Sequence, residues 1–152
     1  MQNVNYPGIL TLLAKYNSSG FQVLAFPCNQ FGAQAPCSSD CERAYLYHKI
    51  GLAPDAAGIT VFDKASINGP GTIAPYTFLK DTGKNGHDAG FDVMWNYEKF
   101  LVDGAGKSVN RYASDASPLA AEGDIRKLLG WEAPREDRRT ATARRSEWND
   151  FR

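Results

Sequence analysis

The first apolar pattern along the chain has the period of a helix, and the second has the character of a buried strand. In PGILTLLAKYNSSG the apolar side chains recur at i, i+3, i+4 and i+7, on one helical face: Ile9, Leu12, Leu13 and Tyr16. With Pro7 near the first turn and Gly20 beyond the end, this pattern predicts a helix over about residues 7–17. FQVLAFP, residues 21–27, is too short and too continuously apolar for an amphipathic helix and predicts a strand buried on both faces. A helix followed by a buried strand indicates an α/β protein.

The middle of the chain repeats this alternation of helix and strand signals. SSDCERAYLYHKIG opens with Ser39 and Glu42 in the spacing of a capping box and closes on Gly51, so we expect a helix over about residues 40–50. GITVFDK has the composition of a short strand, and PYTFLKD predicts one or two helical turns after Pro75. TGKNGHDAGFD is rich in turn formers and is expected to be a loop.

The last globular pattern predicts a hairpin and a final helix. KFLVD and KSVNRYA are strand-like segments on either side of DGAG, which is a tight-turn sequence. Ser117 as N-cap, Pro118 at the first helical position and Gly130 as the stop delimit the helix. Its expected apolar contacts are Leu119, Ile125, Leu128 and Leu129. We assign residues 1–133 to this single domain.

The segment 134–152 differs in composition from the domain. It holds six Arg against four acidic residues and has almost no apolar periodicity. This composition is typical of a tail that is disordered or that becomes ordered on a partner. With Trp131, Trp148 and Phe151 it is a candidate docking segment for another protein.

Length and charge exclude several classes of protein. A chain of 152 residues fits one domain with a real hydrophobic core. Its 17 basic and 17 acidic residues give zero formal net charge, so no overall field favours nucleic acid or an anionic membrane as a partner. No apolar run reaches the roughly 20 residues that span a bilayer, and MQNVNYPG lacks the features of a signal peptide.

The three cysteines allow more than one interpretation. Cys28, Cys37 and Cys41 are an odd number and too few for a disulfide scaffold, which favours a reducing compartment, either the cytoplasm or an organelle. Two thiols at 37 and 41 make an incomplete zinc site, and His48 and His87 lie in unlike contexts, so we expect no metal. Cys28 follows a strand and precedes a loop, which suits a nucleophile as well as a small buried side chain. Spacing alone does not choose between these two.

Several longer motifs together resemble one known family. They are collinear over roughly residues 5–130: NYPGI, LAFPCNQFGAQ, FDKASING, IAPYTFLK, WNYEKFLVDGAGKSVNRYA and SPLAAEGDIRKLLG. This set closely resembles the glutathione peroxidase family of thiol peroxidases. The resemblance implies a thioredoxin-like fold with three α/β/α layers and the reduction of hydrogen peroxide or lipid hydroperoxides in the response to oxidative stress. It implies glutathione or thioredoxin as the reductant and no cofactor.

The resemblance also assigns three supporting site residues, Gln30, Trp95 and Asn96. In the family these positions surround the reactive sulfur or selenium. Amide and indole N–H donors stabilise a negatively charged sulfur or selenium and can orient a peroxide. Each residue also has an ordinary structural interpretation: the Gln as a loop cap, the Trp as a core residue and the Asn as a turn former.

One departure from the family concerns the nucleophile itself. The resemblance places the peroxidatic residue upstream of the NYPGI helix, in a loop after a strand, and neither that loop nor that strand is in this chain. Cys28 matches a motif cysteine that packs beside Gln30. The position of the family's resolving cysteine falls near Tyr47. Cys41, six residues earlier, is either a displaced resolving thiol or a surface or half-buried helix residue, and Cys37 is unassigned.

The missing inner strand should leave unpaired backbone groups around residues 21–27. Three explanations follow: a fragment of a longer peroxidase, an inactive descendant, or a sheet completed by a partner chain. We expect little turnover from the chain as it stands, and the alternative function is a non-catalytic thioredoxin-fold subunit or scaffold. Only 14 residues separate Lys80 from Trp95, which resembles the short-loop, largely monomeric members that accept lipid hydroperoxides.

Overall fold

The computed structural model describes residues 1–53, 56, 58–81 and 90–131. It begins with helix α1, Gln2–Tyr16, which continues into a short 3-10 turn, η1, Asn17–Ser19. The helix starts about five residues before the predicted boundary, and Pro7 lies inside it. The earlier start has a tertiary cause, since Asn5 is only 1% exposed and its Oδ1 accepts a hydrogen bond from Lys99 Nζ at 3.1 Å.

The second helix, α2, Ser39–Ile50, confirms the prediction for this segment but shifts its cap by one residue. The N-cap is Ser38, whose Oγ accepts a hydrogen bond from the Cys41 amide at 3.3 Å. The predicted cap, Ser39, lies in the first helical turn, where its Oγ accepts from Lys64 N at 3.1 Å. Gly51 ends the helix at φ 68°, a left-handed conformation that suits glycine.

The remaining elements follow the predicted order. Strand β1, Val23–Ala25, precedes α2, and strand β2, Ile59–Val61, and helix α3, Ala74–Asp81, follow it. Strands β3, Lys99–Val102, and β4, Ser108–Tyr112, form the expected hairpin, with a bulge between Leu101 and Val102. The chain then forms a 3-10 turn, η2, Pro118–Ala121, and helix α4, Glu122–Leu128.

The final helix confirms its cap but not all of its apolar contacts. Ser117 Oγ accepts a hydrogen bond from Leu119 N at 3.3 Å, as expected of an N-cap. Ile125 is 2% exposed and packs between α1 and β3, whereas Leu119 and Leu128 are 42% and 43% exposed. The predicted helix divides into η2, which holds Leu119, and α4, which holds both Ile125 and Leu128.

The described strands form two separate two-stranded sheets. β1 and β2 pair in parallel, with Leu24 opposite Thr60, and β3 and β4 pair antiparallel. The expectation of a β1 buried on both faces is wrong, because Leu24 is 56% exposed. Among the residues described, β2 is the only strand that pairs with β1. The expected lack of an inner strand stays a prediction.

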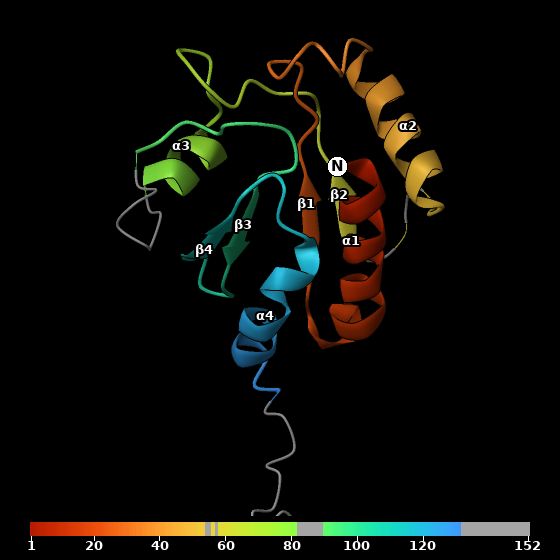
Figure 1. Ribbon diagram of the computed structural model, residues 1–152, viewed down its shortest axis with the longest axis vertical. Coiled ribbons are helices and arrows are strands. Elements are labelled where there is room, and N and C mark those ends of the chain that lie inside the picture. The colour runs from red at the N-terminus through yellow and green to blue at the C-terminus, as the bar shows by residue number, and fades with distance from the viewer. Residues whose placement is uncertain (54–55, 57, 82–89, 132–152) are drawn as a thin grey trace, which may run out of the picture.

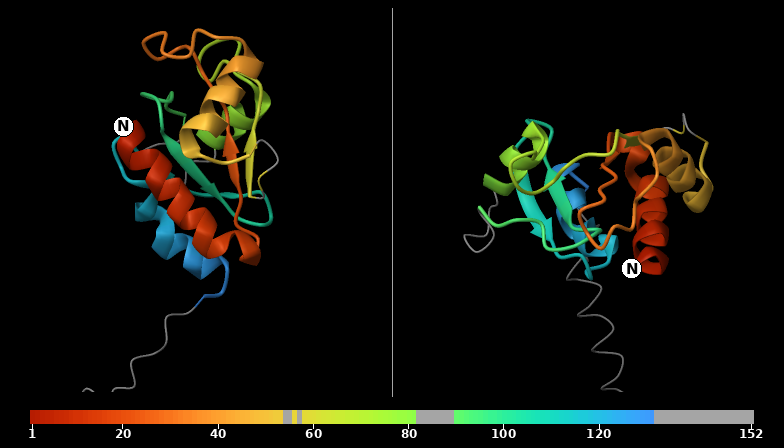
Figure 2. Two further views of the ribbon diagram at one scale, coloured as in Figure 1. Left: turned by 90° about the vertical axis from the view of Figure 1, so that its right-hand side faces the viewer. Right: turned by 90° about the horizontal axis from the view of Figure 1, so that it is seen from above.

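Three clusters of apolar side chains hold these elements together. The first joins α1 and α2 to β2 through Leu13, Tyr47 and Ile59. The second gathers Cys28, Phe31, Ile67 and Val93 below the loops that follow the strands, and the third joins α1 to α4. Figure 1 shows α1 between α2 and α4, and Figure 2 shows α3 on the opposite side of the β3–β4 hairpin from α1.

None of the helices that the structure describes is long and apolar enough to cross a membrane. The predicted tail, 134–152, lies outside the described residues, as do His87, Trp148 and Phe151. Trp131 is described, and its ring meets the Tyr16 ring edge to face at a centroid distance of 5.2 Å. Its indole therefore contacts the domain itself.

Candidate functional site

Three loops meet at the ends of the strands and carry the predicted site residues. Because β1 and β2 are parallel, the loops that follow them leave the same edge of their sheet. These loops are the orange and yellow-green segments at the top of Figure 1. The third loop, residues 90–98, leads into β3 and packs against both through the second apolar cluster.

Gln30 connects the loop after β1 to the loop after β2. Its Oε1 accepts hydrogen bonds from Ile67 N at 2.7 Å and from Asn68 N at 3.0 Å. Its Nε2 donates to Asn68 O at 2.9 Å. The side-chain amide has two N–H donors, so one of them is engaged here and the other can still serve a ligand.

Asn68 extends this connection to the third loop. Its Nδ2 donates to Val93 O at 2.8 Å, and its Oδ1 accepts from Val93 N at 3.0 Å. Sequence reasoning assigned no role to Asn68, although it lies within the FDKASING motif. The only sequence signal for this role was an Asn placed between a strand end and a glycine. Its hydrogen-bond partners are 25 and 38 residues away, so the local sequence does not reveal them.

Trp95 and Asn96 pack against the segment just after Gln30. Asn96 Nδ2 donates to Gln34 Oε1 at 2.9 Å and lies 3.4 Å from Phe31 O. The Trp95 ring is tilted against the Phe31 ring at a centroid distance of 6.1 Å and is 39% exposed. A Cβ added to Gly32 would lie 3.5 Å from this indole, so the backbone and the ring are in close contact.

A buried ion pair fixes the loop that leads to Trp95. Arg111 and Glu98 side chains are 5% and 9% exposed, and the guanidinium lies 3.0 Å from Glu98 Oε1. Arg111 also donates to the carbonyl oxygens of Phe91 and Asp92 at 3.0 and 2.9 Å. Glu98 Oε2 accepts from Met94 N at 2.9 Å. The residues on either side of Trp95 and Asn96 are thus tied to strand β4.

The first turns of α1 reach the same region. Tyr97 has a positive φ of 65°, and its hydroxyl lies 3.1 Å from the hydroxyl of Tyr6. Burial and this hydrogen bond raise the pKa of Tyr6, so its phenol stays protonated near neutral pH. The N-terminal half of α1 therefore lies beside the loop that carries Trp95 and Asn96.

Cys28 is a buried thiol within the second apolar cluster. It is 8% exposed, and its Sγ lies 3.5 Å from Gln30 Oε1 and accepts from Gln30 N at 3.4 Å. Tyr76 belongs to the same cluster, and burial raises its pKa to about 12. Cys28 is thus placed as a packed neighbour of Gln30, away from solvent.

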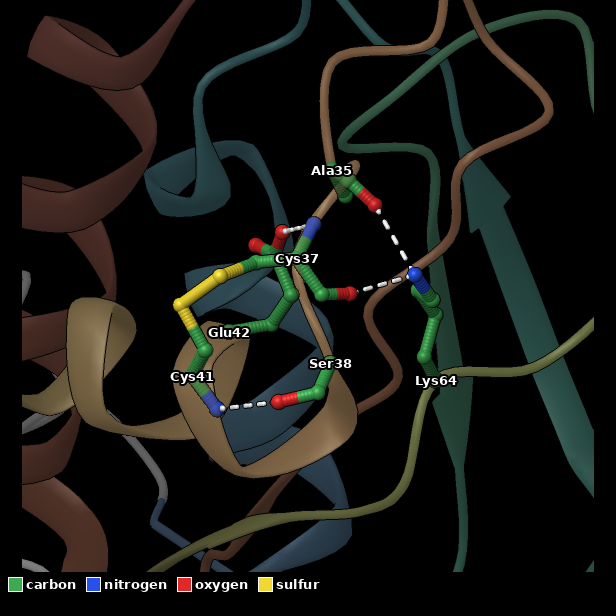
Figure 3. Close-up of a disulfide and its surroundings, with 6 residues drawn as sticks. All are labelled: Ala35, Cys37, Ser38, Cys41, Glu42 and Lys64. Atoms are coloured by element: carbon green, nitrogen blue, oxygen red, sulfur yellow. Dashed lines mark hydrogen bonds between the residues drawn. A yellow bond between two sulfur atoms is a disulfide. The ribbon is translucent and has the colours of Figure 1, made fainter.

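Cys37 and Cys41 form a disulfide at the start of α2 (Figure 3). Their Cα atoms are 5.7 Å apart. Tyr47, near the family's resolving position, is 5% exposed and belongs to the first apolar cluster. Within the described ranges no group of three or more His, Cys, Asp or Glu side chains is arranged to hold a metal ion.

The structure therefore brings the predicted residues together in part. Trp95 and Asn96 share contacts with residues 31–34, and Gln30 reaches them indirectly through Asn68 and Val93. The disulfide lies at the far end of the same loop from Gln30.

The chain is similar in sequence and in structure to known proteins. The glutathione peroxidase family model matches residues 1–80. The chain belongs to the glutathione peroxidase family. It is 44% identical over 127 residues to a probable phospholipid hydroperoxide glutathione peroxidase of Helianthus annuus, covering 84% of this chain and 67% of that protein. It is 42% identical over 125 residues to the chloroplastic phospholipid hydroperoxide glutathione peroxidase 1 of Arabidopsis thaliana, covering 82% of this chain and 50% of the relative.

A solved structure of T. cruzi GPX1 is similar to this glutathione peroxidase family member, with 34% identity and a TM-score of 0.57 over 82% of this chain and 71% of that one. The predicted α/β, thioredoxin-like fold is confirmed by this similarity. The chain spans between 50% and 67% of the length of the two plant relatives named above.

Proposed function

We propose that this protein takes part in the reduction of hydrogen peroxide or lipid hydroperoxides by a thiol reductant, glutathione or thioredoxin. The observation that carries the proposal is the packing of Trp95 and Asn96 against the loop that begins with Gln30. Family membership supports it, and so do the names of the two plant relatives, which specify phospholipid hydroperoxides. The chloroplastic name of one relative supports an organelle as one compartment, beside the cytoplasm.

The three side chains have supporting roles in this proposal. The free N–H of the Gln30 amide and the Trp95 indole N–H are the donors for a reacting sulfur or selenium and its peroxide. The Asn96 amide, which donates to Gln34 Oε1, would join them by exchanging that partner. Donors fixed in advance cost no reorganisation during the reaction, and the tether from Gln30 to Asn68 supplies such fixation. Asn68 is proposed as a positioning residue, since its hydrogen bonds join Gln30, Val93 and Lys80.

The nucleophile in this proposal is none of the chain's own cysteines. Cys28 is buried against Gln30, and Cys37 and Cys41 are bonded to each other. A thiolate must reach the peroxide to attack it. The reacting residue is therefore proposed to be supplied from outside residues 1–152, next to the N-terminal half of α1.

The test begins with the intact mass of the native protein and a peroxide-consumption assay on the same sample. We expect the 152-residue chain to show little turnover with either reductant. The native protein, if its mass exceeds 16.7 kDa, is expected to turn over a phospholipid hydroperoxide. In the active form, Asn96→Ala should lower kcat/KM by about 10²-fold, the typical cost of one lost transition-state donor.

Matched variants separate chemistry from packing. Met94→Ala is the control for Asn96→Ala, because Met94 is 75% exposed and lies two residues from Asn96. Its turnover should equal that of the unmodified protein. Turnover by the 152-residue chain that vanishes in Cys28→Ser but survives in Cys41→Ser would overturn the assignment of Cys28 as a packed residue.

A non-catalytic scaffold is the second candidate function. The observation that favours it is the burial of Cys28 together with the oxidised state of the other two cysteines. A native mass equal to that of this chain, with no turnover of any hydroperoxide, would favour the scaffold over the enzyme.

A further inference from the structure

The Cys37–Cys41 disulfide lies outside the site described above and has no counterpart among the residues that the family resemblance assigns. Cys41 is exposed and Cys37 is half-buried, so a dissolved thiol can approach the bond (Figure 3). The two residues are four positions apart. A disulfide that closes so short a loop restrains the unfolded chain little, and exposed disulfides are the ones that exchange most readily.

The start of α2 suits the reduced state as well as the oxidised one. Cys41 is the third residue of a 12-residue helix, where the positive end of the helix dipole favours a negative charge. The neighbouring Asp40 is paired with Arg43 Nη1 at 2.8 Å, which offsets its charge. Glu42 Oε1 accepts a hydrogen bond from the Cys37 amide at 2.9 Å, a single contact that is weaker than the covalent bond it accompanies.

The disulfide and Lys64 together hold the far end of the loop that bears on Trp95 and Asn96. Lys64 Nζ donates to the carbonyl oxygens of both Ala35 and Cys37. In the middle of the loop, Gln34 Oε1 accepts from Asn96 Nδ2 at 2.9 Å. Only two residues separate Gln34 from the half-cystine at 37, so a change at the disulfide acts over a short length of chain.

We propose that Cys37 and Cys41 form a thiol–disulfide exchange site, opened by a thiol or dithiol reductant, whose redox state controls how tightly residues 31–38 are held against Trp95 and Asn96. The proposal concerns the chain's own thiols and their surroundings. It therefore stands or fails independently of peroxidase activity.

The exchange has two steps. A thiolate of the reductant attacks the exposed Cys41 Sγ and forms a mixed disulfide, while the S–S bond breaks and its electron pair leaves on Cys37 Sγ, which takes a proton from water. A second thiolate of the reductant then attacks the reductant's own sulfur in the mixed disulfide and releases Cys41 as a thiolate at the helix N-terminus. The protein gains two electrons, and the reductant leaves as its disulfide.

The test uses the full chain with Trp131→Phe and Trp148→Phe, which leaves Trp95 as the single tryptophan. The protein is equilibrated with dithiothreitol, with glutathione or with thioredoxin, and its free thiols are then alkylated and counted by mass. Under denaturing alkylation the count should rise from one to three cysteines. The three reductants distinguish a small monothiol, a small dithiol and a protein dithiol as the source of the same chemistry.

The Trp95 emission reports the coupling to the loop. We expect a red shift on reduction as the loop loosens, and the double variant Cys37→Ser/Cys41→Ser should show the red-shifted spectrum without any reductant. Cys28→Ala is the matched control and should leave the shift intact. A cysteine pair that stays oxidised in all three reductants overturns the exchange site, and full reduction with an unchanged Trp95 spectrum overturns the coupling.

The single variants test which sulfur is attacked. With oxidised glutathione, Cys37→Ser should form a mixed disulfide at Cys41, detected as a gain in mass of one glutathionyl group. Cys41→Ser should do so more slowly at the half-buried Cys37. The opposite order contradicts the proposed route of attack.

Discussion

Removing the charge of Arg111 should be among the most damaging single changes in this domain. Arg111 and Glu98 side chains are 5% and 9% exposed and approach to 3.0 Å. Loss of one partner of such a pair leaves the other charge buried without compensation, which costs about 3–5 kcal/mol. Arg111→Met preserves much of the length and the apolar contact with the Phe100 ring, which the guanidinium now covers at 5.0 Å.

The size of the effect should be compared with the total stability of a domain, which is about 5–15 kcal/mol. Arg111→Met is therefore expected to lower the midpoint of urea unfolding strongly while leaving a folded population at low urea. Glu98→Gln is the milder partner variant, because its one amide oxygen can still accept from Arg111, whose guanidinium also keeps its bonds to the Phe91 and Asp92 carbonyl oxygens, while the Met94 amide loses its acceptor. We expect a cost of about 1–3 kcal/mol for it, the range for one impaired hydrogen-bonded group.

Urea unfolding followed by circular dichroism measures both variants and the double variant Arg111→Met/Glu98→Leu. Removing both charges together should cost less than the sum of the single changes, because no isolated charge is then buried. Emission of Trp95 should also shift in Arg111→Met, since Arg111 holds the backbone of Phe91 and Asp92. A cost below about 1 kcal/mol for Arg111→Met, typical of exposed pairs, would refute the reasoning.

Three further predictions concern the scaffold around the site. Gly58→Ala should lower the stability of the domain more than Gly20→Ala. Both glycines have positive φ, which costs other residues about 1–3 kcal/mol, but only at Gly58 would the new Cβ come within 2.4 Å of another side chain. Melting temperatures that fall equally in the two variants would contradict this prediction. Ile125→Ala should lower the free energy of unfolding by about 2–5 kcal/mol and Leu128→Ala by less than about 0.5 kcal/mol, because Ile125 is 2% exposed and Leu128 is 43% exposed. Urea midpoints that move alike in the two variants would show that burial is not the cause. Hydrogen bonds, first from a lysine and then from a tyrosine and an asparagine, lower the pKa of Asp124 to about 2, so its contribution to stability is complete above about pH 4 and is lost as the pH falls toward 2. Asp124→Asn should therefore flatten the dependence of the melting temperature on pH in this range, and an unchanged slope would exclude Asp124 as the group responsible.

Local sequence rules located most of the elements. The helix over residues 39–50, the hairpin around DGAG and the Ser117 cap were predictable, because each depends on neighbours within about four positions. The start of α1 was not, since it depends on Asn5 holding Lys99, 94 residues away. The burial of β1 was also mispredicted, because continuous apolar sequence does not reveal how many strands flank it.

The candidate site divides in the same way. Family motifs named Gln30, Trp95 and Asn96, and those positions do lie on loops that meet at one end of the strands. The engagement of the Gln30 amide with residues 67 and 68 could not be read from the sequence, because loop-to-loop contacts have no periodic signature. The ion pair of Glu98 and Arg111 was hidden for the same reason, as its partners lie on different strands or at their ends.

The amino-acid sequence by itself determined the family, the order of helices and strands, and the absence of overall charge. These follow from composition, period and motifs, which act through neighbouring residues. Only the tertiary structure decided the fate of the cysteines. Ser38 caps α2 in an extended conformation, so Cys37 lies outside the helix and its side chain meets that of Cys41. A helix beginning earlier would have placed both cysteines within the helix, one turn apart along its axis. Cys28 stays free because the packing of three loops encloses it.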